Sequence, residues 1–157
     1  IAKRAAAGIN VTSAPETRWA RRDIKSVNLL PNVLARHGAK EKGAFEAWFV
    51  DADGFVTEGT SSNAWIVDAA GVLRTRALSH DILHGVTRGA ILKIAQERQM
   101  KVEERPFTIE EAKTAREAFI TAASNAATAV IEIDGVRIGD GKPGSVTEAL
   151  RAAYLGA

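Results

Sequence analysis

The sequence has no cysteine, so it can form neither a disulfide framework nor a thiolate-based catalytic site. It also lacks an apolar run long enough to cross a membrane and the pattern of a secretory signal peptide. The formal net charge of +2 is too small to indicate a nucleic-acid partner. These absences predict a soluble, cytoplasmic protein that binds neither membranes nor nucleic acid.

The composition is that of a folded globular protein. A chain of 157 residues with 46% hydrophobic content can bury one substantial core. Apolar periodicity and turn residues predict helices over 28–42, 85–99, 108–113 and 145–154, and strands over 8–13, 17–20, 44–50, 55–58, 63–67, 72–75, 102–105, 118–122, 129–133 and 136–138. Mixed strands and helices with many hairpins and few βαβ units indicate an α+β domain.

Capping residues refine the ends of these helices. Asn28 is suited to cap the first of them, and Pro31 falls in its first turn, where the missing N–H does little harm. Two capping boxes, Thr108-Ile109-Glu110-Glu111 and Ser145-Val146-Thr147-Glu148, predict where the last two helices begin.

Chemistry-bearing residues gather in ordered motifs along the chain. Lys25 lies in Asp23-Ile24-Lys25-Ser26, ahead of Glu58-Gly59-Thr60-Ser61-Ser62-Asn63, Gly85-Val86-Thr87-Arg88, Thr121-Ala122-Ala123-Ser124-Asn125 and Val130-Ile131-Glu132-Ile133-Asp134-Gly135. Taken alone, each of these features is also common in proteins for purely structural reasons. The features are a surface lysine, a carboxylate before a Gly-rich turn and a helix that starts after glycine. Their order is far more specific than any one of them.

The ordered motifs resemble those of the class IV pyridoxal-phosphate-dependent aminotransferases, and are most similar to the D-amino-acid transaminase branch. The resemblance is collinear from about Arg18 to the end of the chain. It implies transfer of an amino group between a D-amino acid, such as D-alanine, and a 2-oxo acid, such as 2-oxoglutarate, with pyridoxal 5′-phosphate as cofactor and no metal.

The same resemblance implies a fold and a domain organisation. The expected fold is the large C-terminal domain of the fold-type IV enzymes, an α+β mixed sheet or pseudo-barrel with flanking helices. Residues 1–20 would be a lead-in segment and residues 21–157 the cofactor-binding domain. A smaller N-terminal domain would be absent from this chain, and the family habit of building the site between subunits implies a homodimer.

Four site residues follow from the resemblance near the cofactor ring. Lys25 matches the Schiff-base lysine, whose amine could afterwards carry a proton, and nearby cations such as Arg21 or Arg22 would lower its pKa. Glu58 matches the carboxylate that keeps the pyridine nitrogen protonated. Leu83 resembles the apolar residue packed on the ring, and Arg18 resembles the arginine near the phenolic oxygen.

Gly85, Val86 and Thr87 resemble the phosphate-binding start of a helix, because unpaired amides and the helix dipole there favour an anion. A second contribution would come from around Ala123 and Ser124. Many D-amino-acid transaminases carry hydroxyl residues where this sequence has Ala122 and Ala123, so Ser124 or the backbone would have to substitute. No substrate-carboxylate clamp can be assigned.

Other functions remain open from the sequence. Branched-chain aminotransferases and aminodeoxychorismate lyases share the lysine and the glutamate, although the branched-chain group more often has glycine after the lysine. A non-catalytic binding domain that uses the Arg/Lys cluster near the start of the chain is a further alternative. The lack of interleaved aromatics and of a nucleic-acid motif disfavours it.

Overall fold

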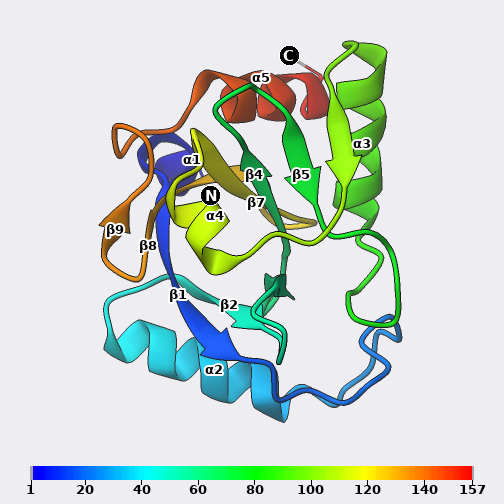
Figure 1. Cartoon of the computed structure of the whole chain (residues 1–157), viewed down its shortest axis with the longest axis vertical. Helices are drawn as coiled ribbons and strands as arrows, with labels where there is room; N and C mark the ends of the chain where they lie inside the picture. Colours follow the sequence, from blue (N-terminus) through cyan, green and yellow to red (C-terminus); the bar gives the residue numbers. More distant parts are fainter. Residues whose placement is uncertain (1, 157) are drawn as a thin grey trace.

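The computed structural model describes residues 2–156 as a mixed sheet flanked by helices (Figure 1). The helices are α1 (Ala2–Ala7), α2 (Leu30–Glu41), α3 (Val86–Glu97), α4 (Ile109–Lys113) and α5 (Ser145–Tyr154). The strands are β1 (Ile9–Pro15), β2 (Glu46–Val50), β3 (Val56–Gly59), β4 (Asn63–Val67), β5 (Leu73–Thr75), β6 (Val102–Glu104), β7 (Glu117–Ala122), β8 (Ala126–Ile133) and β9 (Val136–Arg137).

All of these strands belong to one nine-stranded sheet. Its order is β3-β2-β1-β8-β7-β4-β5-β6, and β9 pairs with β8 off this path. The hairpins expected over 44–58 and 63–75 form as antiparallel pairs, whereas β1 joins β2 and β8 in parallel. The α+β class predicted from the sequence is confirmed. The first strand, from the predicted lead-in segment, lies in the middle of the sheet.

Three apolar clusters hold the sheet and helices together, and the smallest of them packs Ala39 of α2 against Ala44 and Ala47. A second packs α3 and α5 on the sheet through Ile91 and Leu150, around the stacked rings of Trp65 and Phe119, whose centroids are 5.4 Å apart. The third lies around Trp48 and includes residues from α4. Burial of this much apolar surface is the main stabilising term in folding.

Helix α2 lies at the opposite end of the molecule from α5 (Figure 1) and is packed differently. Only Ala39 of this helix is buried. The apolar residues that predicted the helix face outward instead, since Leu30, Val33 and Leu34 are 65%, 60% and 61% exposed. The periodicity therefore predicted the helix correctly but not which of its faces meets the sheet.

The N-terminal region differs most from the sequence prediction. Residues 2–7 form α1, an alanine-rich turn of helix where the sequence analysis predicted no element. Residues 17–20 form no strand. Asn28 does not cap α2, because Leu29 occupies the cap position without a side-chain hydrogen bond. The Asn28 amide instead donates to Ser26 Oγ at 3.2 Å, and Asn28 lines a cavity.

The capping boxes have different outcomes. The Thr108–Glu111 box forms in both directions at α4, as predicted. The Ser145–Glu148 box does not, because Gly144 is the cap residue of α5. The Glu117 carboxylate from β7 accepts hydrogen bonds from the Val146 and Thr147 amides at 3.0 and 2.9 Å instead. A buried acid from another element thus satisfies the helix start.

No helix within residues 2–156 combines the length and apolarity needed to cross a bilayer. In the same described part of the chain, no group of three or more His, Asp or Glu side chains is arranged to hold a metal ion. Ile1 and Ala157, the outermost residues of the predicted domain division, lie outside the described residues.

Candidate active site

A cavity of about 370 Å³ gathers the ordered motifs of the sequence into one place. Its walls come from the segment that carries Lys25, the Glu58–Asn63 turn after β3, the Leu83–Arg88 stretch at the start of α3, and residues 121–123 at the end of β7. Eight of the nine site residues predicted from the sequence line it: Arg18, Lys25, Glu58, Leu83, Gly85, Val86, Thr87 and Ala123.

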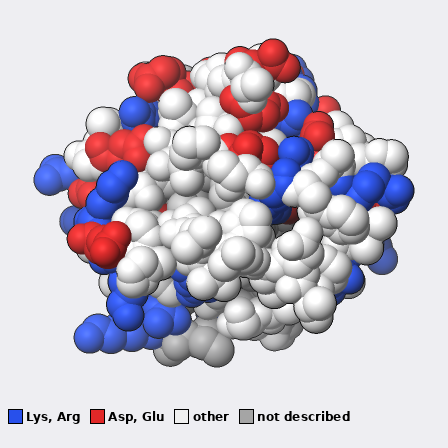
Figure 2. Space-filling model, turned by 90° about the horizontal axis from the view of Figure 1, so that it is seen from below, with Lys and Arg blue, Asp and Glu red and all other residues white. Residues whose placement is uncertain are grey.

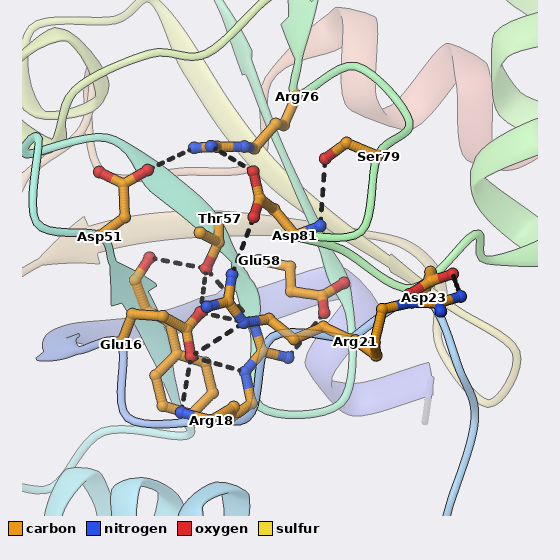
Figure 3. Close-up of polar contacts among 12 residues, drawn as sticks. Glu16, Arg18, Arg21, Asp23, Asp51, Thr57, Glu58, Arg76, Ser79 and Asp81 are labelled. Carbon is orange, nitrogen blue, oxygen red and sulfur yellow. Dashed lines mark hydrogen bonds and ion pairs between the residues drawn. The ribbon is translucent and has the colours of Figure 1, made fainter.

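Glu58 is the buried acid of this cavity. Its Oε2 accepts hydrogen bonds from Asn63 Nδ2 at 2.9 Å and from the Leu83 amide at 3.0 Å. Its Oε1 lies 2.7 Å from Arg18 Nη1, and Figure 3 shows these two side chains. Burial raises the pKa of Glu58 to about 7, even though Arg18 and the Leu83 amide act in the opposite direction. The carboxyl group is thus held in one orientation and titrates near neutrality.

Arg18 lies beneath Glu58 and is itself tightly held. Its Nε and Nη2 donate to Glu16 at 2.9 and 2.7 Å, and its guanidinium stacks on the Phe49 ring at 4.4 Å (Figure 3). Burial alone would raise the pKa of Glu16, but the hydrogen bonds and charge of Arg18 outweigh it and hold that pKa below its usual value. Arg18 therefore belongs to a fixed ionic cluster in the cavity wall.

The start of α3 offers backbone donors to the same cavity. Gly85 is the cap residue, and no side chain caps the helix. The first-turn amides of Val86 and Thr87 have no acceptor within the helix, so they and the helix dipole favour an anion here. The Thr87 side chain is buried, with its hydroxyl 3.5 Å from the Tyr154 hydroxyl.

Gly85 is required by close packing rather than by its backbone angles, because its φ is −64°. A Cβ at this position would overlap Asn63 Oδ1. Asn63 cannot easily withdraw, since its Nδ2 donates both to Glu58 and to the Leu83 carbonyl at 2.9 Å. Because residue 85 is glycine, the first turn of α3 can pack directly against Asn63, the residue that orients Glu58.

We expect Gly85→Ala to destabilise the fold by roughly 1–3 kcal/mol through this overlap. Gly89→Ala is the matched control four residues later in α3. Nothing lies within 4 Å of a Cβ there, and alanine is preferred in a helix interior, so that variant should gain up to about 1 kcal/mol. Urea unfolding of both variants measures the difference, and equal effects would contradict the packing argument.

Lys25 lies on the cavity wall in a segment without helix or strand, and it is exposed. Among residues 2–156 its ammonium has no hydrogen bond or ion pair. The two arginines expected to act on it are compensated by carboxylates: Arg21 bonds Asp23 at 2.8 and 2.9 Å, and Arg22 bonds Asp81 at 3.1 Å. The amine is available to react with a group in the cavity.

Ser124 is the one predicted site residue that the structure does not place in the cavity wall. It is exposed in the turn between β7 and β8, where its hydroxyl accepts a hydrogen bond from Asn125 Nδ2 at 3.2 Å. Ala122 and Ala123 line the cavity in its place. A contribution from backbone groups of this turn, the other expectation, stays a prediction.

Sequence reasoning missed the residues that orient the predicted ones. Asn63 is the last residue of the Glu58–Asn63 motif, but its hydrogen bond to Glu58 forms only because β4 begins directly after the turn. Glu46 is fully buried and accepts hydrogen bonds from Thr60 Oγ1, the Ser61 amide and Ser62 Oγ at 2.9, 2.7 and 2.8 Å. Nothing in the spacing of Glu46 to this turn singles it out.

Comparison with known proteins agrees with this geometry. The family model of class IV amino-transferases matches residues 2–133. The D-alanine aminotransferase of Bacillus licheniformis is 40% identical over 146 residues, which are 93% of this chain and 51% of that protein. That of Staphylococcus aureus (strain N315) is 40% identical over 147 residues, covering 94% and 51%.

Solved structures of related enzymes share the fold. The branched-chain amino acid aminotransferase of Escherichia coli superposes with a TM-score of 0.83 at 29% identity, over 95% of this chain and 52% of that one. A second branched-chain amino acid aminotransferase, solved with pyridoxamine 5′-phosphate, gives a TM-score of 0.86 at 29% identity, over 98% and 51%. The chain spans about half the length of these relatives.

Pyridoxal phosphate is the cofactor of this family, and the cavity fits it on structural grounds. One wall holds a buried carboxyl whose pKa of about 7 would fall beside a cationic ring nitrogen. Another offers the uncapped amides of α3 for a phosphate, and the available Lys25 amine borders the same cavity. By fold, site and the family model, this chain belongs to the class IV aminotransferases.

Proposed function

We propose that this chain provides the cofactor-binding part of an enzyme that moves an amino group between a D-amino acid, such as D-alanine, and a 2-oxo acid, such as 2-oxoglutarate. The observation that carries the proposal is the single cavity that brings together Lys25, Glu58 and the start of α3. The choice of D-amino acids rests on the 40% identity to two D-alanine aminotransferases.

When bound, pyridoxal phosphate supplies an electron sink for negative charge at the substrate Cα. In our proposal Glu58 holds the ring nitrogen in its protonated form, because a buried carboxylate prefers a cation beside it to an apolar wall. Asn63 and the Leu83 amide fix the direction of that carboxylate. Leu83 would pack on the ring face, and Arg18 would lie near the phenolic oxygen.

The other end of the cavity binds the phosphate in this proposal. The Val86 and Thr87 amides would donate to phosphate oxygens, and Ala123 would add its backbone group. Lys25 is the proton carrier: its Nζ accepts the proton of the substrate Cα as a general base and returns a proton as a general acid. Holding the phosphate at the start of α3 would fix the cofactor in the cavity that Lys25 also lines.

Branched-chain amino acids are the second candidate substrates, because the superposed solved structures include branched-chain aminotransferases. The identity to those enzymes is 29%, against 40% for the D-alanine aminotransferases, which favours the first candidate. The two are separated by adding D-alanine or L-leucine to the protein with pyridoxal phosphate and following the cofactor absorbance. Faster conversion with L-leucine would overturn the D-amino-acid proposal.

We also propose a homodimer, and the exposed apolar face of α2 supports it. Leu30, Val33 and Leu34 lie on this helix, and the preceding Val27 is 98% exposed. Figure 2 views the molecule from below, the end where α2 lies, and uncharged side chains make up most of the centre of that face. Exposed apolar patches of this kind mark interaction surfaces.

We expect Val33→Glu to shift the protein from dimer to monomer, because a charge in an apolar interface loses its hydration without gaining a partner. Leu155→Glu is the matched control, since Leu155 is 59% exposed at the far end of the molecule. Sedimentation velocity reports the oligomeric state. A wild-type protein that sediments as a monomer, or a Val33→Glu dimer, would contradict the assignment of this face.

A further inference from the structure

Charged side chains of alternating sign form a row that starts at Glu58 in the cavity wall, and Figure 3 labels all of its members except Arg22. In order they are Glu58, Arg18, Glu16, Arg22, Asp81, Arg76 and Asp51, and the successive contacts measure 2.7, 2.7, 3.7, 3.1, 2.9 and 2.8 Å. The row crosses from the segment that precedes Lys25 to the loop that precedes α3. The motifs identified in the sequence do not include Glu16, Asp51, Arg76 or Asp81.

Asp81 is the residue at which the two segments meet. One of its oxygens accepts a hydrogen bond from Arg22 Nη1 at 3.1 Å, and the other accepts one from Arg76 Nη2 at 2.9 Å. The Arg22 amide also donates to the His80 carbonyl at 2.9 Å, so backbone and side chain join the same two segments.

The Arg76 side of this contact is anchored to the sheet. Arg76 Nη1 donates to Asp51 Oδ2 at 2.8 Å and to the Val56 carbonyl at 3.3 Å. The Arg76 carbonyl in turn accepts a hydrogen bond from the buried Arg88 at 2.9 Å. One Asp81 oxygen is thus held by Arg76, which is anchored to the sheet, and the other accepts the hydrogen bond from Arg22.

Each of the two segments carries one half of the proposed chemistry. Arg22 is three residues before Lys25, in a stretch from residue 16 to residue 29 that has no helix or strand. Asp81 is two residues before Leu83, whose amide donates to Glu58 and whose carbonyl accepts from Asn63. The Arg22–Asp81 ion pair therefore connects the segment that carries Lys25 to the segment whose Leu83 amide orients Glu58.

We propose that Asp81 is a positioning residue: through Arg22 it holds the Lys25 segment in register with the Leu83–Glu58 contact at the cavity floor. This inference rests on the proposed function, because it concerns where the Lys25 amine is held. The Asp81 side chain is 42% exposed but that of Arg22 is only 14% exposed, so loss of the pair is expected to lower global stability as well. The positioning role is therefore tested by the reactivity of Lys25 relative to another lysine and not by the melting temperature.

The test compares Asp81→Asn with Asp53→Asn, a matched control whose side chain is exposed in the β2–β3 turn and has no ion pair among residues 2–156. Each protein is incubated with pyridoxal phosphate and reduced with borohydride. Mass spectrometry then gives the initial labelling rate of Lys25 relative to Lys93, an exposed lysine on α3. The ratio removes any general change in lysine accessibility.

We expect Asp81→Asn to lower this ratio about tenfold, because loss of register by about 1 Å is costly for a bound reaction. Tryptic cleavage after Arg22 should become faster in the same variant. Asp81→Glu keeps the charge and should recover most of the ratio, whereas Asp53→Asn should match the wild type. Arg22→Gln combined with Asp81→Asn should be no worse than either change alone, because the two residues act as one pair.

The outcomes separate this inference from the proposed function. If the wild type shows no preference for Lys25 over Lys93, the proposed function fails. If the wild type prefers Lys25 and Asp81→Asn keeps that preference with an unchanged cleavage rate, only the positioning role fails.

Discussion

Replacing Glu58 with glutamine is expected to raise the free energy of unfolding by on the order of 3 kcal/mol near pH 8 and to leave it almost unchanged near pH 4. Burial raises the pKa of Glu58 from 4.5 to about 7 in the folded protein, so between these values the folded state binds the extra proton. The contribution of the protonated Glu58 carboxyl to the free energy of unfolding is fully present below about pH 4.5. It is lost as the pH rises through 7, where the folded protein must ionise a buried acid. Glutamine resembles the protonated acid at every pH.

Urea unfolding from pH 4 to pH 8 without added pyridoxal phosphate measures this effect as the difference between variant and wild type. Glu16 and Asp81 have lowered pKa values, so their contribution to the free energy of unfolding rises with pH. Both proteins contain these acids, so their effect cancels in the difference. Glu97→Gln is the control, since Glu97 is a 62% exposed helix residue. A Glu58→Gln difference that does not grow with pH would contradict the raised pKa of Glu58, in which burial outweighs the Arg18 pair. We expect Glu58→Gln to be more stable but less active than the wild type, as is common for a destabilising residue that is kept for function.

Replacing Lys25 with alanine is expected to lower the rate of cofactor conversion by D-alanine by at least about 10³-fold, because both the reacting amine and the proton carrier are removed. The fold should be unaffected, because Lys25 is exposed and has no polar contact in the described part of the chain. Lys25→Arg should be equally inactive, since a guanidinium stays protonated and cannot act as a base.

Rapid-mixing absorbance measurements on wild type, Lys25→Ala and Lys93→Ala test this expectation. Lys93 is 77% exposed on α3, so its loss should leave the rate unchanged. A Lys25→Ala protein that still converts the cofactor within tenfold of the wild-type rate would remove Lys25 from the mechanism, whereas a change in the unfolding transition would reveal a structural role.

The sequence predicted most elements because local rules agree with the fold where the chain makes hairpins and capped helices. Asp53-Gly54 turns β2 into β3, and Gly54 has a positive φ of 86°, as such a turn requires. Thr108 and Glu111 close their capping box. In these places, residues next to one another in sequence provide all of the interactions.

Errors arose where a distant residue replaces the local partner. Ser145 was expected to cap α5, but Glu117, from a strand far earlier in the chain, reaches both first-turn amides. Asn28 was expected to cap α2 and instead borders the cavity. Nothing in a local pattern reports a competing partner from another element, so such substitutions cannot be read from spacing.

The candidate site shows the same division. Lys25, Glu58 and the start of α3 were predicted because the order of their motifs resembles that of a known family, and the structure brings all three to one cavity. The residues that hold them, such as Asp81, Glu46 and Asn63, are ordinary polar residues until the sheet brings them together. Ser124 was predicted from the resemblance as a possible substitute for hydroxyl residues, but it is exposed in the β7–β8 turn and does not line the cavity.

The most direct measurement of the central claim is the location of the cofactor on this chain. The protein is incubated with pyridoxal phosphate, reduced with borohydride, digested and mapped by mass spectrometry, in parallel with Lys25→Ala. We predict a single dominant pyridoxyl adduct on the peptide that contains Lys25, absent from the variant and reduced by inorganic phosphate competing at the start of α3. Adducts spread evenly over the exposed lysines, with no excess at Lys25, would contradict the account.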